Sequence, residues 1–298
     1  ILFTLLNLLS TPYIIAYFCL FVKGGVEWLT MALFVLPFDH RATFAKELLG
    51  FPYPRFTSAQ KKTVNEYKRM VWEGFLQARA TISDPEELAI LIDEEFGASI
   101  LKEAVTQHIP FALSTEKSGQ PVFDFEYGAA WAAHLKNWKP AYAKALVRYN
   151  VTNTKDNRVQ NARLKTLSDF CKKSGIGFMI EPLMTGAGSR FSQLRQTIQE
   201  MTAMGVFPTL WKVEAVATAS QWKQLRALTG VSIIFLGRGD TTAHVESWLK
   251  IAAGSGAVGG FAIGRTIFLQ PLMNYRDKKI TRAKAVEKIA QNFTYFIN

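Results

Sequence analysis

Lys212 stands inside an apolar segment that reads FPTLWKVEAV from position 207 to 216. Burying an ammonium group is costly unless the group has a partner or a chemical task. One such task is Schiff-base formation, in which a desolvated amine near another cation loses its proton and attacks a carbonyl group. The alternative is a lysine at a strand end whose ammonium reaches water while its methylenes stay buried. The polar residues of the neighbouring segments favour the chemical task.

Lys144, Glu181 and Asp39 are the residues that would assist Lys212. Side-chain alternation puts Lys144, Leu146 and Arg148 on one face of an extended segment. If that face meets Lys212, the second ammonium favours a neutral, nucleophilic Lys212 amine. Glu181 would then shuttle protons, with Asp39 as a second acid/base group. A buried ion network that only stabilises the fold remains the alternative.

Two loops near the C-terminus carry the same dipeptide, Gly-Arg, directly after an apolar segment. Glycine lets a ligand approach the backbone closely, and a guanidinium group matches the oxygens of a phosphate. We therefore expect phosphate binding at these loops, against the alternative of two turns whose arginines pair with nearby carboxylates. The loop residues concerned are Gly237, Arg238 and Gly239 in the first loop and Gly264 and Arg265 in the second.

Short apolar segments alternate with amphipathic helical patterns along the chain, and these elements must position the polar residues. The segments are rich in Ile, Val, Leu and Phe, which is typical of a parallel sheet covered on its faces. Glycines at 175, 205 and 230 follow helical patterns where a left-handed cap is expected. Eight strand–helix units in one domain predict an α/β fold, the (β/α)₈ TIM barrel. The expected strands are 33–38, 88–92, 111–114, 143–147, 177–180, 209–213, 232–236 and 260–263.

The helical patterns between the strands show apolar stripes at helical spacing. One stripe is expected at Val159, Ala162, Leu167 and Phe170, and others follow at 191–201, 222–228 and 286–293.

Polar residues follow every one of the eight expected strands, where the active site of such a barrel lies. Phosphate in these barrels often binds after the last two strands, where the Gly-Arg loops fall. The candidate site residues are Asp39, Arg41, Glu116, Lys144, Arg148, Glu181, Lys212, Gly237, Arg238, Gly239, Gly264 and Arg265, and His40 is the one histidine placed for function.

Composition narrows the class of protein. With 298 residues, 49% of them hydrophobic, the chain can bury the core of one large domain. The net charge of +11 suits phosphorylated substrates, whereas scattered lysines and arginines argue against nucleic acid as a partner. The two cysteines have no disulfide or zinc spacing, which favours a reducing compartment such as the cytoplasm.

Two other motifs are set aside. No cluster of His, Cys and carboxylates has metal-ligand spacing, so we expect no metal. The glycine-rich string GSGAVG at 254–259 precedes a strand instead of following one, so it lacks the geometry of a dinucleotide site.

Residues 1–30 differ from the rest of the chain because they begin with a long run of uncharged, mostly apolar residues. The run 1–22 has no charge and the length of a membrane span, but Asn7, Ser10 and Pro12 interrupt it, and no basic segment precedes it. We interpret 1–30 as a non-native or leader-like hydrophobic extension, with a native start at Met31 and the (β/α)₈ domain over 31–298. A signal anchor, which would make a membrane-anchored enzyme, is the alternative.

Several motifs together resemble one family. They include LPFDHRATF from 36, IDEEFG from 92, EKSG from 116, FDFEYG from 123, LVRYN from 146, LWKVE from 210, LGRG from 236 and IGRT from 263. The chain from about Ala32 onward is similar to the aldolase-like domain often fused behind the deoxy-keto-gluconate kinase of bacterial inositol catabolism. That domain is related to the class I tagatose bisphosphate aldolases.

The resemblance implies a class I (Schiff-base) aldolase on a (β/α)₈ barrel. It implies a covalent imine on Lys212, no cofactor, an acid/base Glu181, a second lysine at Lys144, an aspartate at Asp39 and a phosphate site at Gly264-Arg265. Ala42 stands where glycine is usual, and the loop 184–189 differs from the family pattern, which affects the expected substrate preference more than the chemistry.

The expected substrate is 2-deoxy-5-keto-D-gluconate 6-phosphate, cleaved to dihydroxyacetone phosphate and malonate semialdehyde. A tagatose, fructose or sulfo-sugar phosphate is the alternative substrate, and a non-catalytic sugar-phosphate sensor is the alternative function. We also expect a homo-oligomer, a separate sugar kinase of the same pathway as a partner, and neither nucleic acid nor membrane as partners.

Overall fold

The computed structural model describes residues 18–22, 25–29 and 32–298, and the chain divides into the units Ile1–Met31 and Ala32–Asn298. In the first unit, β1 (Phe18–Val22) and β2 (Gly25–Leu29) form an antiparallel pair with Phe18 opposite Leu29. The apolar run 1–22 lies outside the described residues except for its last five, which form β1. No helix in the described part of the chain has the length and hydropathy to cross a membrane.

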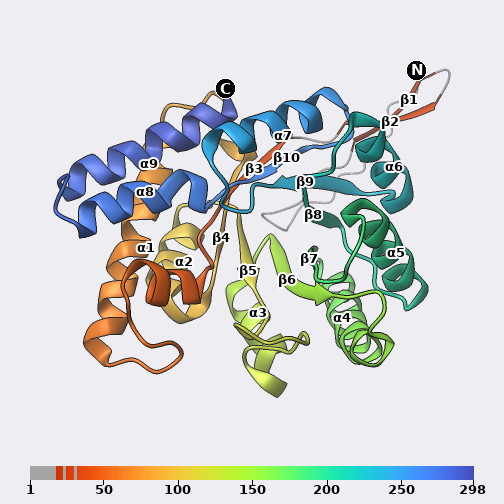
Figure 1. Ribbon diagram of the computed structural model, residues 1–298, viewed down its shortest axis with the longest axis horizontal. Coiled ribbons are helices and arrows are strands. Elements are labelled where there is room, and N and C mark those ends of the chain that lie inside the picture. Colours follow the sequence, from red (N-terminus) through yellow and green to blue (C-terminus); the bar gives the residue numbers. More distant parts are fainter. Residues whose placement is uncertain (1–17, 23–24, 30–31) are drawn as a thin grey trace. The chain divides into compact units, whose positions relative to one another are not determined.

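The second unit is a (β/α)₈ TIM barrel, as the alternation of segments predicts. Its eight parallel strands close in the order β10-β3-β4-β5-β6-β7-β8-β9, with helices outside them (Figure 1). The strands are β3 (Leu33–Pro37), β4 (Leu88–Ile92), β5 (Phe111–Ser114), β6 (Tyr142–Tyr149), β7 (Gly177–Met184), β8 (Leu210–Glu214), β9 (Ser232–Leu236) and β10 (Gly260–Ala262).

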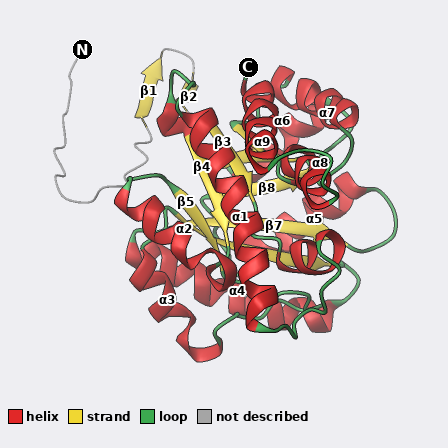
Figure 2. Ribbon diagram, turned by 90° about the vertical axis from the view of Figure 1, so that its left-hand side faces the viewer, coloured by secondary structure: helices red, strands yellow, loops and turns green. Residues whose placement is uncertain are grey.

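The helices surround this barrel, as the second view shows (Figure 2). They are α1 (Ser58–Arg79), α2 (Glu94–Thr106), α3 (Trp131–Trp138), α4 (Thr154–Ser174), α5 (Arg190–Ala203), α6 (Ala219–Thr229), α7 (Thr242–Gly254), α8 (Arg265–Arg276) and α9 (Arg282–Ile297), with short helical turns at Thr43–Leu48, Pro85–Glu87 and Gly128–Ala130.

The polar residue before most of these helices explains where each begins. Thr57 accepts a hydrogen bond from the backbone of Gln60 and forms a reciprocal capping box with it at the start of α1. Asp93 caps α2 and Ser189 caps α5, each by accepting a hydrogen bond from the backbone N–H three residues further on. Glycines 175, 205 and 230 have φ of 66°, 78° and 66° after their helices, as their sequence positions predict.

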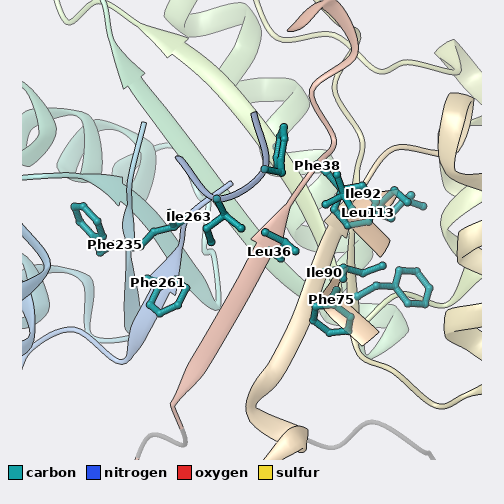
Figure 3. Close-up of a cluster of buried hydrophobic side chains, with 14 of the residues drawn as sticks. Leu36, Phe38, Phe75, Ile90, Ile92, Leu113, Phe235, Phe261 and Ile263 are labelled. Atoms are coloured by element: carbon teal, nitrogen blue, oxygen red, sulfur yellow. The ribbon is translucent and has the colours of Figure 1, made fainter. Parts of the chain in front are cut away.

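Two clusters of buried apolar side chains stabilise the barrel. The larger one lies between the strands and the helices, where Leu36 and Ile90 face outward toward Phe75 of α1 (Figure 3). The smaller one fills the barrel interior and contains Val35, Ala89, Leu91, Ala112, Tyr142, Met179, Leu210, Ile234 and Ala262. Because side chains alternate along a strand, the residue two positions after an interior one also points inward. Tyr142, Met179 and Leu210 are followed in this way by Lys144, Glu181 and Lys212.

The expected apolar stripe on α4 is wrong at its first two positions. Val159 is 44% exposed and Ala162 is also exposed. The buried face of the helix instead carries Asn157, Gln160 and Asn161. Asn157 and Gln160 donate hydrogen bonds to backbone carbonyls at the end of β6, so buried amides replace apolar contacts there.

Candidate functional site

A buried ionic cluster lies at the carboxyl end of the barrel interior. Lys144 Nζ donates hydrogen bonds to Asp39 Oδ2 at 2.8 Å and to Glu116 Oε1 at 2.7 Å, and lies 3.1 Å from Glu181 Oε2. Lys212 Nζ donates to the same Glu181 oxygen at 2.9 Å. Asp39, Glu116, Lys144, Glu181 and Lys212 are all less than 9% exposed. Five sequence-predicted residues from five strands or their ends therefore meet in one place.

The alternation of side chains explains why the two lysines converge. In the pairing of β6 with β7, Leu146 lies opposite Glu181, so Lys144 is one pleat below that carboxylate. Lys212 enters from β8, the next strand around the barrel. One carboxylate oxygen of Glu181 thus bridges two ammonium groups, which fixes both nitrogens on the barrel axis.

Charge and burial oppose each other at Lys144. Burial alone lowers the pKa of an ammonium, but Asp39, Glu116 and Glu181 together raise the pKa of Lys144 well above its ordinary value. Lys144 is therefore a fixed cation at neutral pH.

The carboxylates of the cluster respond in two ways. Burial raises the pKa of a carboxyl group, but for Glu181 the attraction of Lys144 and Lys212 is larger, and the net pKa is lowered. The pKa of Asp39 is lowered as well, by Lys144 and His40 against burial. At Glu116 burial prevails over Lys144, and the pKa is raised.

His40 lies beside this cluster and keeps a free ring nitrogen. Burial lowers the pKa of its imidazole to about 4, although Asp39 opposes the shift. Its Nδ1 lies 3.9 Å from Asp39 Oδ1 and has no hydrogen-bond partner among the described residues. His40 is therefore neutral at pH 7, with a ring nitrogen ready to accept or donate a hydrogen bond.

A cavity of about 160 Å³ opens onto the cluster. Its reactive wall carries Asp39, Lys144, Glu181 and Lys212, and its outer wall is built by the segment that follows β5. That segment folds back on itself through a backbone bridge between Glu116 and Phe125. The remaining lining residues are His40, Arg41, Ala42, Thr43, Glu116, Lys117, Ser118, Gly119, Gln120, Phe123, Leu146 and Arg148.

The predicted binding arginines divide between two environments. Arg148 is exposed, lines the cavity and donates from Nη1 to the Gln120 carbonyl oxygen at 3.1 Å. Arg41 is only 4% exposed and its guanidinium bonds the Glu126 carboxylate and the Glu116 carbonyl oxygen. Arg41 thus supports the cavity wall, with much of its hydrogen-bonding capacity used inside the protein.

The two Gly-Arg loops lie next to each other but outside this cavity's lining. Arg265 Nη2 donates to the carbonyl oxygen of Arg238. Gly264 precedes α8, which has no side-chain cap, so amide groups at its start are available to an anion. Gly239 has a φ of 77°, which favours glycine, and a Cβ on Gly264 would collide with the Pro37 carbonyl oxygen.

Arg238 turns away from Arg265 toward a second cavity of about 220 Å³. Its Nη1 lies 2.7 Å from Glu214 Oε1, and Arg190 Nε lies 3.7 Å from Glu214 Oε2. Burial raises the pKa of Glu214, against the pull of Arg190 and Arg238. Neither Arg190 nor Glu214 stands out as a site residue in the sequence, because an arginine at a helix start and a glutamate at a strand end are both common.

Sequence reasoning also missed Lys68, which is fully buried on α1. Its ammonium pairs with Asp93 and lies 5.1 Å from the centre of the Phe44 ring. Asp93 also accepts a hydrogen bond from Phe96 N at the start of α2. A helical lysine gives no sign in the sequence that it will be enclosed, so only the packing of α1 on the barrel reveals this pair.

The described residues were compared with the side-chain groupings that bind metal ions in proteins. Among residues 18–22, 25–29 and 32–298, no group of three or more His, Cys, Asp or Glu is arranged to hold a metal ion.

The chain belongs to a protein family described as an uncharacterised protein conserved in bacteria, DUF2090, whose model matches residues 26–298. A search of curated proteins found no match.

Solved structures with the same fold include several aldolases. The protein Cgl0159 of Corynebacterium glutamicum is 15% identical, with a TM-score of 0.57 over 89% of this chain and 86% of that one. An archaeal fructose 1,6-bisphosphate aldolase is 11% identical, with a TM-score of 0.55 over 89% and 94%. The fructose-bisphosphate aldolase of Slackia heliotrinireducens is 10% identical, with a TM-score of 0.56 over 87% and 86%. At these identities the similarity shows a shared fold.

Proposed function

We propose that this protein is a class I aldolase that cleaves a phosphorylated keto sugar acid through an imine on Lys212. The observation that carries the proposal is the unequal sharing of carboxylates between two buried lysines. Among the described residues, Lys144 contacts three carboxylates, whereas Lys212 contacts one, Glu181. Of the two amines, Lys212 is therefore the one less surrounded by carboxylates, which suits a nucleophile, and Glu181 lies at hydrogen-bond distance to shuttle protons.

The reaction follows from these positions. The neutral Lys212 amine attacks the ketone carbon, and loss of water yields an iminium ion. A base, assigned to Asp39, takes the proton from the hydroxyl group on the carbon two positions from the iminium carbon. The bond between that hydroxyl-bearing carbon and the carbon next to the iminium then breaks. Its electron pair moves to the iminium, giving an enamine and releasing the aldehyde. Glu181 returns a proton to the enamine carbon, and water then hydrolyses the imine.

The phosphate is assigned to the loops after β9 and β10, on Arg265, Arg238, Gly237, Gly239 and the amides that follow Gly264. On the other side of the cavity, the exposed cations Lys117 and Arg148 would face the acid end of the substrate. Opposite charges at both ends suit a keto sugar acid that carries a phosphate.

The substrate proposed is 2-deoxy-5-keto-D-gluconate 6-phosphate, with dihydroxyacetone phosphate and malonate semialdehyde as products. Its support is the motif resemblance to the aldolase-like domain of inositol catabolism, together with the aldolase names of similar folds. A tagatose, fructose or sulfo-sugar phosphate is the alternative substrate. A cytoplasmic location, a partner sugar kinase and a homo-oligomeric state belong to the same proposal.

Borohydride trapping with dihydroxyacetone phosphate tests the imine. We expect intact mass and peptide mapping to place the reduced adduct on Lys212, and Lys212→Met to lose it. The control Lys223→Met, at an exposed position of α6, should keep it. No adduct in the native protein, with ligand binding still detectable by calorimetry, would overturn the imine mechanism.

Turnover separates an enzyme from a sensor that retains the same lysine. Dihydroxyacetone phosphate released from the proposed substrate can be followed with a coupled dehydrogenase. We expect catalytic release that disappears in Lys212→Met. Trapping without turnover on any of the named sugar phosphates would assign the protein to sugar-phosphate sensing.

A further inference from the structure

The cavity around Glu214 contains two charged groups, Arg190 and Glu214, to which the reaction above gives no role. It is lined by Arg190, Glu214, Arg238 and Trp248, together with backbone and small side chains of the segment after β8, and has a volume of about 220 Å³. Since one water molecule occupies about 30 Å³ of liquid, the cavity is large enough for a phosphoryl group with its first carbon.

The hydrogen-bonding capacity of these groups is left unsatisfied. Glu214 is 3% exposed, yet apart from the backbone of Met184 no described residue donates a well-formed hydrogen bond to its carboxylate. A buried carboxylate is normally bonded by several donors. The Arg190 and Arg238 side chains are 48% and 47% exposed, and their guanidinium groups donate no hydrogen bond to another described residue. Two cations and one anion therefore leave a net positive charge with free donors.

The cavity adjoins the proposed reaction centre. Glu214 follows Lys212 by two residues on β8 and so lies about 6.6 Å further along the same face of the strand. The backbone of Arg238 holds the Arg265 guanidinium. A substrate bound through Lys212 can thus extend one end toward Arg190 and Arg238.

We propose that Arg190 and Arg238 bind the phosphate of a phosphate monoester in this cavity, and that Glu214 competes with that phosphate for the two guanidinium groups. The inference rests on the proposed function, which assigns the substrate's phosphate to Arg238 and the loops after β9 and β10, and it adds Arg190 to the groups that bind that same phosphate. Guanidinium forks match phosphate oxygens in pairs, whereas Glu214 offers one oxygen to each arginine, at 2.7 Å from Arg238 and 3.7 Å from Arg190. Glu214 keeps the two arginines positioned, and its negative charge limits how tightly the phosphate binds.

Opposite effects of two substitutions test this competition. Isothermal calorimetry with inorganic phosphate should show Kd rising about tenfold or more in Arg190→Gln, since charge-assisted hydrogen bonds are lost. Glu214→Gln keeps the shape and removes the competing charge, so Kd should fall by a similar factor. The controls are Arg195→Gln, an exposed arginine further along α5, and Glu66→Gln, an exposed glutamate of α1, and both should leave Kd unchanged.

Three results would overturn the inference. These are an unchanged Kd in both cavity variants, weaker phosphate binding in a folded Glu214→Gln protein, and malonate binding as tight as phosphate with the same response to the substitutions. The last result would assign the cavity to carboxylates. If Glu214→Gln does not fold, Arg190→Gln decides the outcome, because its side chain is half exposed and its loss leaves the core intact.

Trapping then links the cavity to the reaction. Arg190→Gln should lower borohydride trapping of dihydroxyacetone phosphate on Lys212 toward the level seen with uncharged dihydroxyacetone, and should leave trapping of the uncharged ketone unchanged. Equal loss with both ketones would contradict a phosphate-specific role. Absence of any imine in the native protein would count against the proposed function, and the phosphate titration would still decide whether the cavity binds phosphate.

Discussion

Lys144 is the residue on which the electrostatics of the barrel interior depend. Its ammonium contacts Asp39, Glu116 and Glu181, and each of these carboxylates is less than 9% exposed. Buried carboxylates without a cation are strongly unfavourable, so Lys144 makes the presence of three of them tolerable. Lys212 is thereby left with a single carboxylate, which suits a nucleophile.

Substituting Lys144 with methionine should reverse the pH dependence of stability as well as reduce stability. Leaving the carboxylates unpaired should lower the free energy of unfolding by about 3–5 kcal/mol at pH 7.5. In the native protein the lowered pKa values of Asp39 and Glu181 contribute stability that is lost only as pH falls below their unfolded values near 4. In Lys144→Met, repulsion should raise these pKa values, so the variant should gain stability as pH falls from 7.5 to 5.

Urea unfolding at pH 7.5 and pH 5 measures this effect. The exposed control Lys102→Met should match the native protein at both pH values. A deficit of equal size at the two pH values would show that Lys144 acts through packing instead of charge.

Residue identity was predictable where charge and strand position coincide. Asp39, Glu116, Lys144, Glu181 and Lys212 each follow or interrupt an apolar strand, and the barrel topology brings such positions together. Side-chain direction was not predictable. Arg238 was expected to bind phosphate, with pairing to a nearby carboxylate as the alternative, and its guanidinium lies against Glu214.

At the scale of elements, the start of α8 depends on close contact with β3. Gly264 is buried against the Pro37 carbonyl oxygen, with room for no side chain. This contact sets the position of Arg265, the first residue of α8. The helix therefore carries an arginine to the barrel mouth only because its cap residue lacks a Cβ.

Gly264→Ala should move this helix start. We expect a loss of about 1–3 kcal/mol in the free energy of unfolding, the usual cost of overpacking, and weaker phosphate binding. Gly254→Ala, at the end of α7, is the matched control, because a Cβ there meets no atom within 4 Å. Chemical denaturation and phosphate calorimetry give the two readings. Unchanged stability in Gly264→Ala would contradict the close contact.

The order and type of elements were predictable because strand and helix periods differ, and glycine and capping residues mark the boundaries. The two longest strands were underestimated: β6 and β7 run over Tyr142–Tyr149 and Gly177–Met184, since polar residues inside them looked like strand ends. The predicted apolar stripe on α4 was wrong at Val159 and Ala162, because buried amides occupy that part of the helix's inner face. Asn157 and Gln160 satisfy backbone groups of the barrel, a role that hydrophobic periodicity does not reveal.

At the scale of the molecule, all eight barrel strands lie within the unit Ala32–Asn298. Strand β3 pairs with β10 on one side and β4 on the other, which closes the sheet without residues 1–30. The functional domain over 31–298 stays a prediction, and a shortened protein tests it.

A protein beginning at Met31 should therefore fold and act like the full chain. We expect a Tm within about 2 °C of the full-length value, since every barrel strand is retained, and the same borohydride trapping on Lys212. Scanning calorimetry and intact mass provide the comparison. A Tm lowered by 5 °C or more would show that residues 1–30 stabilise the barrel, contrary to their interpretation as an extension.

The pairing of β3 with β10 also affects how the barrel can form during translation. Among the barrel strands, a ribosome synthesises β3 first and β10 last. One edge of β3 therefore stays unpaired until β10 has been made. An unpaired apolar edge is prone to join another nascent chain. We therefore expect slow elongation or crowded polysomes to lower the yield of folded protein more for this chain than for one whose strands pair only with their immediate successors. Chaperones that cover β3 during translation should raise that yield.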